Sequence, residues 1–198
     1  MARAKVVVRP ATLARWDDLV RLFGPRGACA GCWCQWGRKR HADFRRDTGA
    51  ANRRSLRRLV ASGEPPGLLA YLDGVPVGWC AVAPRETYVR LAGSRVLAPV
   101  DTRPVWAALC FFVAREVRGR GVTVALLRAA AEYAATRGAD TIEGYPLDTG
   151  GKRSPAAFAW WGLAPAFRKA GFREVARRSP TRPIMRKRLR PGRRLARG

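Results

Sequence analysis

The stretch that most constrains the fold is Val105–Arg137, where an apolar run leads through glycines and arginines into a helical pattern. The run Val105–Val113 is rich in β-branched and aromatic residues and is too short for a solitary helix, so it predicts a buried strand. From about Val122, apolar residues recur at helical spacing until Arg137 and Gly138. We therefore expect a strand, a tight basic turn and a helix in succession.

The turn between this strand and helix is typical of an anion site. It contains two glycines and three arginines: Arg115, Arg118, Gly119, Arg120 and Gly121. The first turn of a helix leaves amide N–H groups without partners and carries roughly half a positive charge. Glycines let a phosphate approach the backbone, and arginines at the rim neutralise the remaining charge. A pyrophosphate is the ligand that this pattern favours.

The spacing within the turn distinguishes between pyrophosphate ligands. Val124 stands where the dinucleotide fingerprint needs a third small residue, and no Gly-Lys-Ser/Thr sequence follows for a P-loop. The segment Arg118–Thr123, RGRGVT, instead resembles the acetyl-CoA motif Gln/Arg-x-x-Gly-x-Gly/Ala of the GNAT N-acetyltransferases. Thr123 departs from that family, which usually has Gly or Ala here. A threonine either crowds the pyrophosphate or donates its hydroxyl to it.

Two further segments are similar to GNAT motifs in the same order, Asp73–Trp79 as the hairpin before the central sheet and Phe167–Phe172 as the Tyr-x-x-x-Gly-Phe ending. The likeness extends from about Lys5 to Leu189. It implies the GNAT acyl-CoA N-acyltransferase fold of the α/β (α+β) class, a central mixed twisted sheet of six to seven strands flanked by helices. We expect one domain over residues 1–189 and a basic disordered tail over 190–198.

The resemblance also implies the ligands. Acetyl-CoA would be the co-substrate, and the acceptor would be an amine of a small molecule or peptide. Three residues at the strand end would flank the pantetheine arm through backbone groups, namely Phe112, Val113 and Arg115. The turn itself would surround the pyrophosphate, with Arg118, Gly119, Arg120, Gly121, Val122 and Thr123.

The proton-transfer groups depart from the family pattern. Phe167 replaces the tyrosine that often protonates the leaving thiolate, and Ala107 and Leu109 stand where the family often has a glutamate or histidine base. On the next predicted strand, Glu143 as base and Tyr145 as acid are the remaining candidates. Catalysis mainly by positioning of the reactants would tolerate the loss of the usual groups.

Three thiols lie close together at Cys29, Cys32 and Cys34, with His41 seven residues further on. They could form a zinc site, but the Cys-x-Cys spacing is too tight for the usual ligand pairs, and we expect no metal. The alternatives are small buried residues of a loop that carries Trp33 and Trp36, or a thiol relay. The odd number of five cysteines favours reduced thiols.

The composition adds a second hypothesis about function. The chain has 198 residues, 47% of them hydrophobic, and a formal net charge of +25. No apolar run reaches the length of a membrane span, so we expect a cytoplasmic protein. The charge predicts non-specific nucleic-acid binding through a basic surface. The alternative function is therefore a nucleic-acid-binding or regulatory protein on a degenerate GNAT scaffold, and a homodimer stays open.

Local patterns predict the remaining elements. Arg85, Tyr88 and Arg90 are expected to be solvated, with contact to an acidic acceptor or to the phosphates of CoA as the alternative. Elsewhere we expect a strand over Lys5–Arg9, helices capped by Thr12 and Thr48 and ending at Gly24 and Ala61, a hairpin of Gly67–Leu72 with Val75–Val82, a helical turn over Glu86–Ala92, a strand over Thr141–Tyr145, and a final pair of Phe172–Ala176 with Ile184–Leu189.

Overall fold

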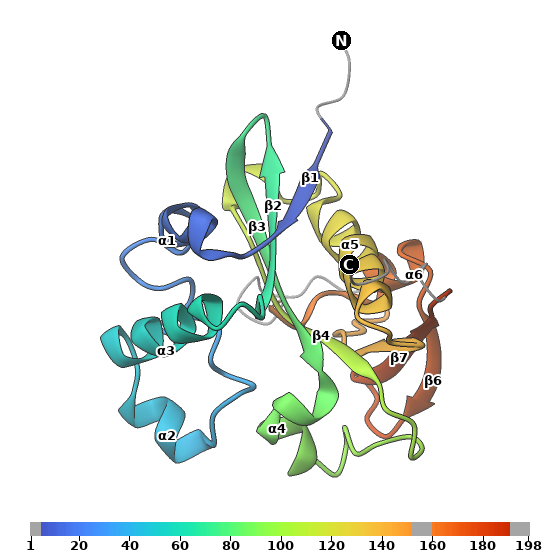
Figure 1. Ribbon diagram of the computed structural model, residues 1–198. Helices are drawn as coiled ribbons and strands as arrows, with labels where there is room; N and C mark the ends of the chain where they lie inside the picture. The colour runs from blue at the N-terminus through green and yellow to red at the C-terminus, as the bar shows by residue number, and fades with distance from the viewer. Residues whose placement is uncertain (1–4, 152–159, 191–198) are drawn as a thin grey trace, which may run out of the picture.

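The computed structural model describes residues 5–151 and 160–190. A mixed seven-stranded sheet has the strand order β1-β2-β3-β4-β5-β7-β6. Figure 1 shows this sheet running through the molecule. The strands are β1 Val7–Pro10, β2 Gly67–Leu72, β3 Val75–Pro84, β4 Trp106–Val113, β5 Thr141–Gly144, β6 Arg173–Arg177 and β7 Pro183–Arg188. The predicted fold class, with six to seven strands, is confirmed.

Helices cover both faces of this sheet. Those described are α1 Trp16–Phe23, α2 His41–Arg46, α3 Ala50–Ala61, α4 Val89–Ala92, α5 Val122–Thr136 and α6 Ala164–Lys169, with short 3-10 turns at Leu13–Arg15, Arg85–Thr87 and Arg115–Val117. Figure 1 places α1, α2 and α3 on one side of the sheet and α5 and α6 on the other. This division matches two buried apolar clusters, one on each face.

Alternation along the strands produces the two clusters. In β2, Leu69 packs with Trp79 of β3 in the cluster that contains α1 and α3. Its neighbour Leu68 packs in the other cluster, which contains Leu126 of α5. Because successive side chains of a strand point to opposite faces, a strand buried on both faces reads as a continuous apolar run. The apolar runs of β2, β3 and β4 are therefore explained by burial on both sides.

The strands β4 and β5 run parallel for only a short distance before they part. Their ladder joins Trp106 to Ile142 and ends with Ala108 opposite Gly144. The strand β4 continues to Val113, still paired with β3 on its other edge. The register with β3 shifts between Cys80 and Ala81. Beyond Ala108, one edge of β4 therefore has no strand partner among the described residues.

Of the two predicted threonine caps, the one at Thr48 is wrong. Thr12 is the N-cap residue of the 3-10 turn Leu13–Arg15 that leads into α1 at Trp16, although its side chain makes no capping bond. The helix α3 begins at Ala50 after Gly49, whose φ of +84° turns the chain sharply. The Thr48 hydroxyl instead donates to the Phe44 carbonyl over 3.1 Å, so it extends the end of α2. The predicted tail lies outside the described residues apart from Arg190.

Candidate active site

The turn between β4 and α5 has the geometry of an open cradle. Gly119 and Gly121 have φ angles of +77° and +83°, in the left-handed region that favours glycine. A Cβ atom added at either position would meet nothing within 4 Å. Gly121 is the N-cap of α5, and the first turn of this helix contains no acidic residue. The unpaired amides of the helix start therefore face open space, and no acidic side chain of the first helical turn competes for them.

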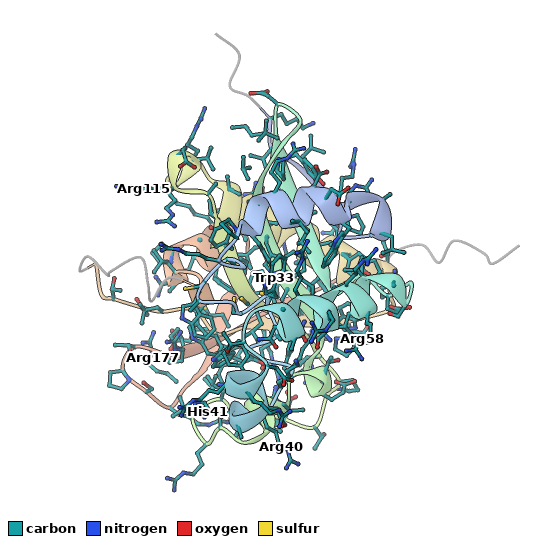
Figure 2. The ribbon with its side chains drawn as sticks, turned by 90° about the vertical axis from the view of Figure 1, so that its left-hand side faces the viewer. Trp33, Arg40, His41, Arg58, Arg115 and Arg177 are labelled. Atoms are coloured by element: carbon teal, nitrogen blue, oxygen red, sulfur yellow. The ribbon has the colours of Figure 1, made fainter. Side chains whose placement is uncertain are left out.

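Three exposed arginines surround this cradle. Arg118 is fixed by a bond of 3.1 Å from its Nε to the Val113 carbonyl, which attaches the turn to the end of β4. Arg115 projects from the rim of the molecule in Figure 2, and Arg120 is also exposed. The structure thus brings the predicted pyrophosphate residues, from Arg118 to Thr123, together in one turn and the first residues of one helix.

The predicted pantetheine residues lie where β4 leaves β5. Phe112 and Val113 are half-buried at the end of β4. The Phe112 ring packs against Phe23 of α1, with centroids 5.9 Å apart. Since the β4 edge beyond Ala108 is free of its neighbour strand, its amides and carbonyls can bond to an extended ligand. An arm entering between the strands would pass from the basic turn toward Tyr145.

Glu143 and Tyr145, the predicted base and acid, lie side by side and are fully buried. The Tyr145 hydroxyl donates to Glu143 Oε1 over 2.6 Å, and Arg186 Nε donates to Oε2 over 2.6 Å. Arg85 Nε lies 3.4 Å from Oε1. Burial, and then the charge of Glu143, raise the pKa of the Tyr145 hydroxyl well above its ordinary value. The carboxylate is therefore paired with two guanidiniums, and the tyrosine is a protonated donor.

The cysteine-rich loop packs into the core below α1. Trp33 lies between α1 and α3 in Figure 2, and it is buried. Trp79 Nε1 donates to Cys34 Sγ over 2.8 Å. Burial raises the pKa of the Cys32 thiol to about 11. All five cysteines are free, and within residues 5–151 and 160–190 no group of three His, Cys, Asp or Glu side chains could hold a metal ion.

Tyr88, predicted to be solvated, is buried with only 1% of its surface exposed. Its hydroxyl has no hydrogen-bond partner among the described residues. Gly37 lies against its ring and against Leu109, because a Cβ at Gly37 would overlap both side chains. The Glu86–Ala92 pattern is too short to predict which side of the turn is buried. The residue that packs on Tyr88, Gly37, lies in a loop about fifty positions earlier in the chain.

An aromatic group lies next to Tyr145, and its members come from distant parts of the chain. The Trp36 ring centroid lies 4.5 Å from that of Trp160 and 4.9 Å from that of Trp161. Trp161 in turn meets the Tyr145 ring edge-on at 6.2 Å. Arg182 covers the Trp161 ring at 4.8 Å. The sequence did not indicate Arg182, because the prolines on either side of it predict a turn but not which side chain packs on the aromatic group.

The comparisons with known proteins agree with this geometry. A profile of the acetyltransferase (GNAT) family matches residues 32–150, which is more than half of the chain. That match begins within the cysteine-rich loop and runs past the end of β5, so it includes the turn between β4 and α5, and the class of fold is that of an acetyltransferase. The chain belongs to the GNAT acetyltransferase family.

Solved structures support the same fold. An acetyltransferase of the GNAT family from Streptococcus agalactiae has 14% identity and a TM-score of 0.56, covering 93% of this chain and 96% of its own. A polyamine N-acetyltransferase from Drosophila melanogaster has 12% identity and a TM-score of 0.56, covering 93% and 100%. A putative acetyltransferase from Salmonella typhimurium, solved with acetyl-CoA, has 14% identity and a TM-score of 0.52, covering 95% and 96%.

At these identities the likeness establishes the fold alone. A comparison with curated protein sequences finds no match. Within the described part of the chain, no helix is both long enough and apolar enough to cross a membrane.

Proposed function

We propose that the protein is an acetyl-CoA-dependent N-acetyltransferase that acetylates an amine of a small molecule or peptide. The observation that carries this proposal is the open turn at Gly119 and Gly121, which joins β4 to the start of α5 inside the family match. The GNAT family uses acetyl-CoA, and the Salmonella typhimurium structure was solved with it. The described residues fit this co-substrate because the free strand edge, the arginines and the helix-start amides follow one another along the chain.

In the proposed complex, the segment Arg118–Thr123 holds the pyrophosphate, and Phe112, Val113 and Arg115 flank the pantetheine arm. What supports the first assignment is the absence of an acid from the first turn of α5 and the open space at both glycines. What supports the second is the free edge of β4 beyond Ala108. The domain boundary at residue 189, the cytoplasmic location and a homodimer stay predictions.

The proposed reaction is a direct transfer. The acceptor loses a proton to become a neutral amine, and its nitrogen attacks the thioester carbon. A C–N bond forms and the C–S bond breaks, the attacking nitrogen loses its second proton to give the amide, and the CoA thiolate leaves and takes up a proton. Holding both reactants in one site contributes most of the rate, through an effective molarity that can reach roughly 10⁵ M or more.

We propose Tyr145 as the acid that protonates the thiolate and Glu143 as the base that receives a proton from the acceptor amine. Glu143 also positions the Tyr145 hydroxyl. Their contact supports this pairing, since the Tyr145 hydroxyl bonds directly to Glu143 Oε1. Arg85 and Arg186 compensate the buried carboxylate. Both side chains are fully buried, so the proton would pass directly between the Tyr145 hydroxyl and a reactant that contacts it.

The test is calorimetric titration with acetyl-CoA, followed by an assay of free thiol in the presence of amines. S-acetylpantetheine, which lacks the pyrophosphate, is the matched ligand control. We expect saturable binding of acetyl-CoA and at least about tenfold weaker binding of the control, since pyrophosphate contacts are charge-assisted. Failure to bind acetyl-CoA would refute the proposal.

The formal net charge of +25 favours one alternative function, nucleic-acid binding on a degenerate GNAT scaffold. The two functions differ in salt dependence. Affinity for nucleic acid falls steeply as salt neutralises the phosphate contacts, and a preference for one sequence that survives moderate salt would favour the alternative. Turnover of acetyl-CoA with any amine would favour the enzyme.

A further inference from the structure

Two arginines lie against the aromatic group beside Tyr145. The Cζ atom of Arg182 is 4.8 Å from the centroid of Trp161, and that of Arg90 is 4.6 Å from the centroid of Trp36. The two indoles are themselves 4.9 Å apart. The group therefore has a guanidinium on each of two neighbouring tryptophans, and the arginines come from α4 and from the turn between β6 and β7.

Each of these arginines is fixed by a carbonyl and leaves donors free. Arg182 Nη1 donates to the Tyr145 carbonyl over 3.2 Å, and Arg90 Nε donates to the Lys39 carbonyl over 3.1 Å. The Nη2 atom of Arg90 is buried without a hydrogen-bond partner among the described residues. A guanidinium held in this way keeps a planar set of donors for a carboxylate or phosphonate.

No carboxylate in the described part of the chain pairs with Arg90 or Arg182, although other arginines around the site are paired. Arg186 is bound to Glu143 and Asp101, and Arg177 to Asp148. Burial lowers the pKa of both Arg90 and Arg182 from the ordinary value, in keeping with the lack of a paired carboxylate at either guanidinium. An anionic ligand would offset it.

The position of Arg182 connects this charge with the proposed chemistry. The carbonyl that it binds belongs to Tyr145, the residue directly after β5, where β4 and β5 part. Trp161, under the guanidinium, contacts the ring of the same tyrosine. A group bound by Arg182 would therefore lie beside the free edge of β4, at the place where an acceptor meets the thioester.

We propose that the acceptor is an amine whose own molecule carries a carboxylate or phosphonate, which Arg182 binds as the principal anchor and Arg90 as the second cation, over Trp36 and Trp161. This inference rests on the proposed acetyltransferase function and specifies its substrate class. It separates this chain from the Drosophila melanogaster polyamine N-acetyltransferase, which takes a cationic acceptor by its description. A polyamine would meet repulsion from both guanidiniums.

The first experiment measures kcat/KM by thiol release for matched amines, expressed per neutral amine. The acidic members are β-alanine, glutamate and 2-aminoethylphosphonate, and the uncharged or cationic members are β-alaninamide, glutamine and agmatine. We expect kcat/KM for an acidic amine to be about tenfold or more above that for its uncharged counterpart, since a hydrogen bond to a charged group stabilises a complex by about that factor. A phosphonate preference and a carboxylate preference would identify which oxyanion the site takes.

The second experiment assigns the selectivity to Arg182. Arg182→Gln keeps a donor for the Tyr145 carbonyl and removes the charge, whereas Arg182→Lys keeps the charge. Arg173→Gln on β6 removes the same charge from an exposed position and is the control for the general field. We expect Arg182→Gln to raise KM for the acidic amine by about tenfold with little change in acetyl-CoA affinity, Arg182→Lys to recover part of it, and Arg173→Gln to leave it unchanged.

The outcomes separate this inference from the proposed function. If the enzyme prefers β-alaninamide or agmatine, or if Arg182→Gln keeps the selectivity, the acidic-acceptor inference is overturned while the acetyltransferase stands. If acetyl-CoA does not bind, the proposed function fails, and tryptophan fluorescence then decides the inference. Saturable change of fluorescence by 2-aminoethylphosphonate in the wild type but not in Arg182→Gln would support the anion site, and equal response would overturn it.

Discussion

At the scale of the single residue, Gly121 is the most direct test of the pyrophosphate turn. A carboxylate in Gly121→Glu would occupy the open space at the start of α5 and repel the ligand. We expect acetyl-CoA affinity, measured by calorimetry, to fall by at least about tenfold. Gly121→Ala is the control, since it carries only the strain of the left-handed φ, roughly 1 kcal/mol. Unchanged affinity in the glutamate variant would remove the turn from the site.

The pair of Glu143 and Tyr145 allows stability and catalysis to be separated. Glu143→Gln leaves Arg186 and Arg85 facing a neutral amide in a buried place, so we expect a loss of roughly 3–5 kcal/mol in the free energy of unfolding. Tyr145→Phe removes one hydrogen bond and should cost about 1 kcal/mol. Denaturant titration measures both changes.

Kinetics give the second half of this test. If Tyr145 protonates the thiolate, Tyr145→Phe should lower kcat by about a hundredfold while acetyl-CoA affinity is kept. A variant with wild-type kcat would show that Tyr145 has only a structural role. Glu143→Gln should lower kcat as well, and it must be assayed well below its melting temperature.

The residues that the sequence could predict are those whose neighbours are local. Gly119 and Gly121 follow from the motif because the turn and the helix start are contiguous in the chain. Arg182 and Trp161 do not follow, since their contact depends on how the β6–β7 turn returns to the sheet. The burial of Tyr88 was missed for the same reason, as its cover includes Gly37 and Leu109.

At the scale of elements, Asp148 connects the segment after β5 to α6 and β6. It accepts from Arg168 over 3.0 Å and from Arg177 over 2.8 Å, and these partners, Arg177 first, lower the pKa of its carboxyl. A lowered pKa in the folded state adds stability that is fully present above the unfolded value of about 3.9 and is lost as pH falls through the folded value.

The consequence can be measured by thermal unfolding as a function of pH. We expect Asp148→Asn to melt at a lower temperature than the wild type at neutral pH, and the difference to shrink as the pH falls below about 4. Asp140→Asn, at an exposed carboxylate that forms no ion pair among the described residues, is the control. A difference in melting temperature that stays constant down to acid pH would mean that the charge of Asp148 does not stabilise the contact between these elements.

The contact between β5 and α6 requires a glycine at position 144, because the Phe167 ring occupies the space of a side chain there. A Cβ at Gly144 would overlap the ring of Phe167, which is itself fully buried. We expect Gly144→Ala to cost about 1–3 kcal/mol in the free energy of unfolding. In a Phe167→Leu background the same substitution should cost clearly less, and additive losses in this double-mutant cycle would contradict direct contact.

Elements were predictable where the signal is periodic or where two residues fix a turn. The hairpin at Asp73 and Gly74 joins β2 to β3 as expected, and the pattern from Val122 gives α5. The cap at Thr48 was wrong because a cap depends on the direction in which the preceding chain arrives. At Thr48 that direction is set by Gly49 and by the end of α2.

At the scale of the whole molecule, the excess of basic residues opposes compactness. The chain has 39 Lys and Arg against 14 Asp and Glu, and like charges gather on α3, where Arg53, Arg54, Arg57 and Arg58 are all exposed. Arg57 lies one turn after Arg53 and Arg54, so the three repel one another at low salt.

Reversing one of these charges should therefore stabilise the protein. Arg57→Glu would face Arg53 and Arg54 with an opposite charge, and we expect its melting temperature to exceed that of the wild type in about 0.02 M NaCl and the gain to disappear in about 0.5 M NaCl. Arg57→Lys keeps the charge and serves as the matched control. Because salt screens the same repulsion, the wild type should also melt at a higher temperature in the more concentrated salt. If Arg57→Glu is less stable than the wild type at low salt, the charge at position 57 acts on folding through local ion pairs rather than through the net charge of the whole chain.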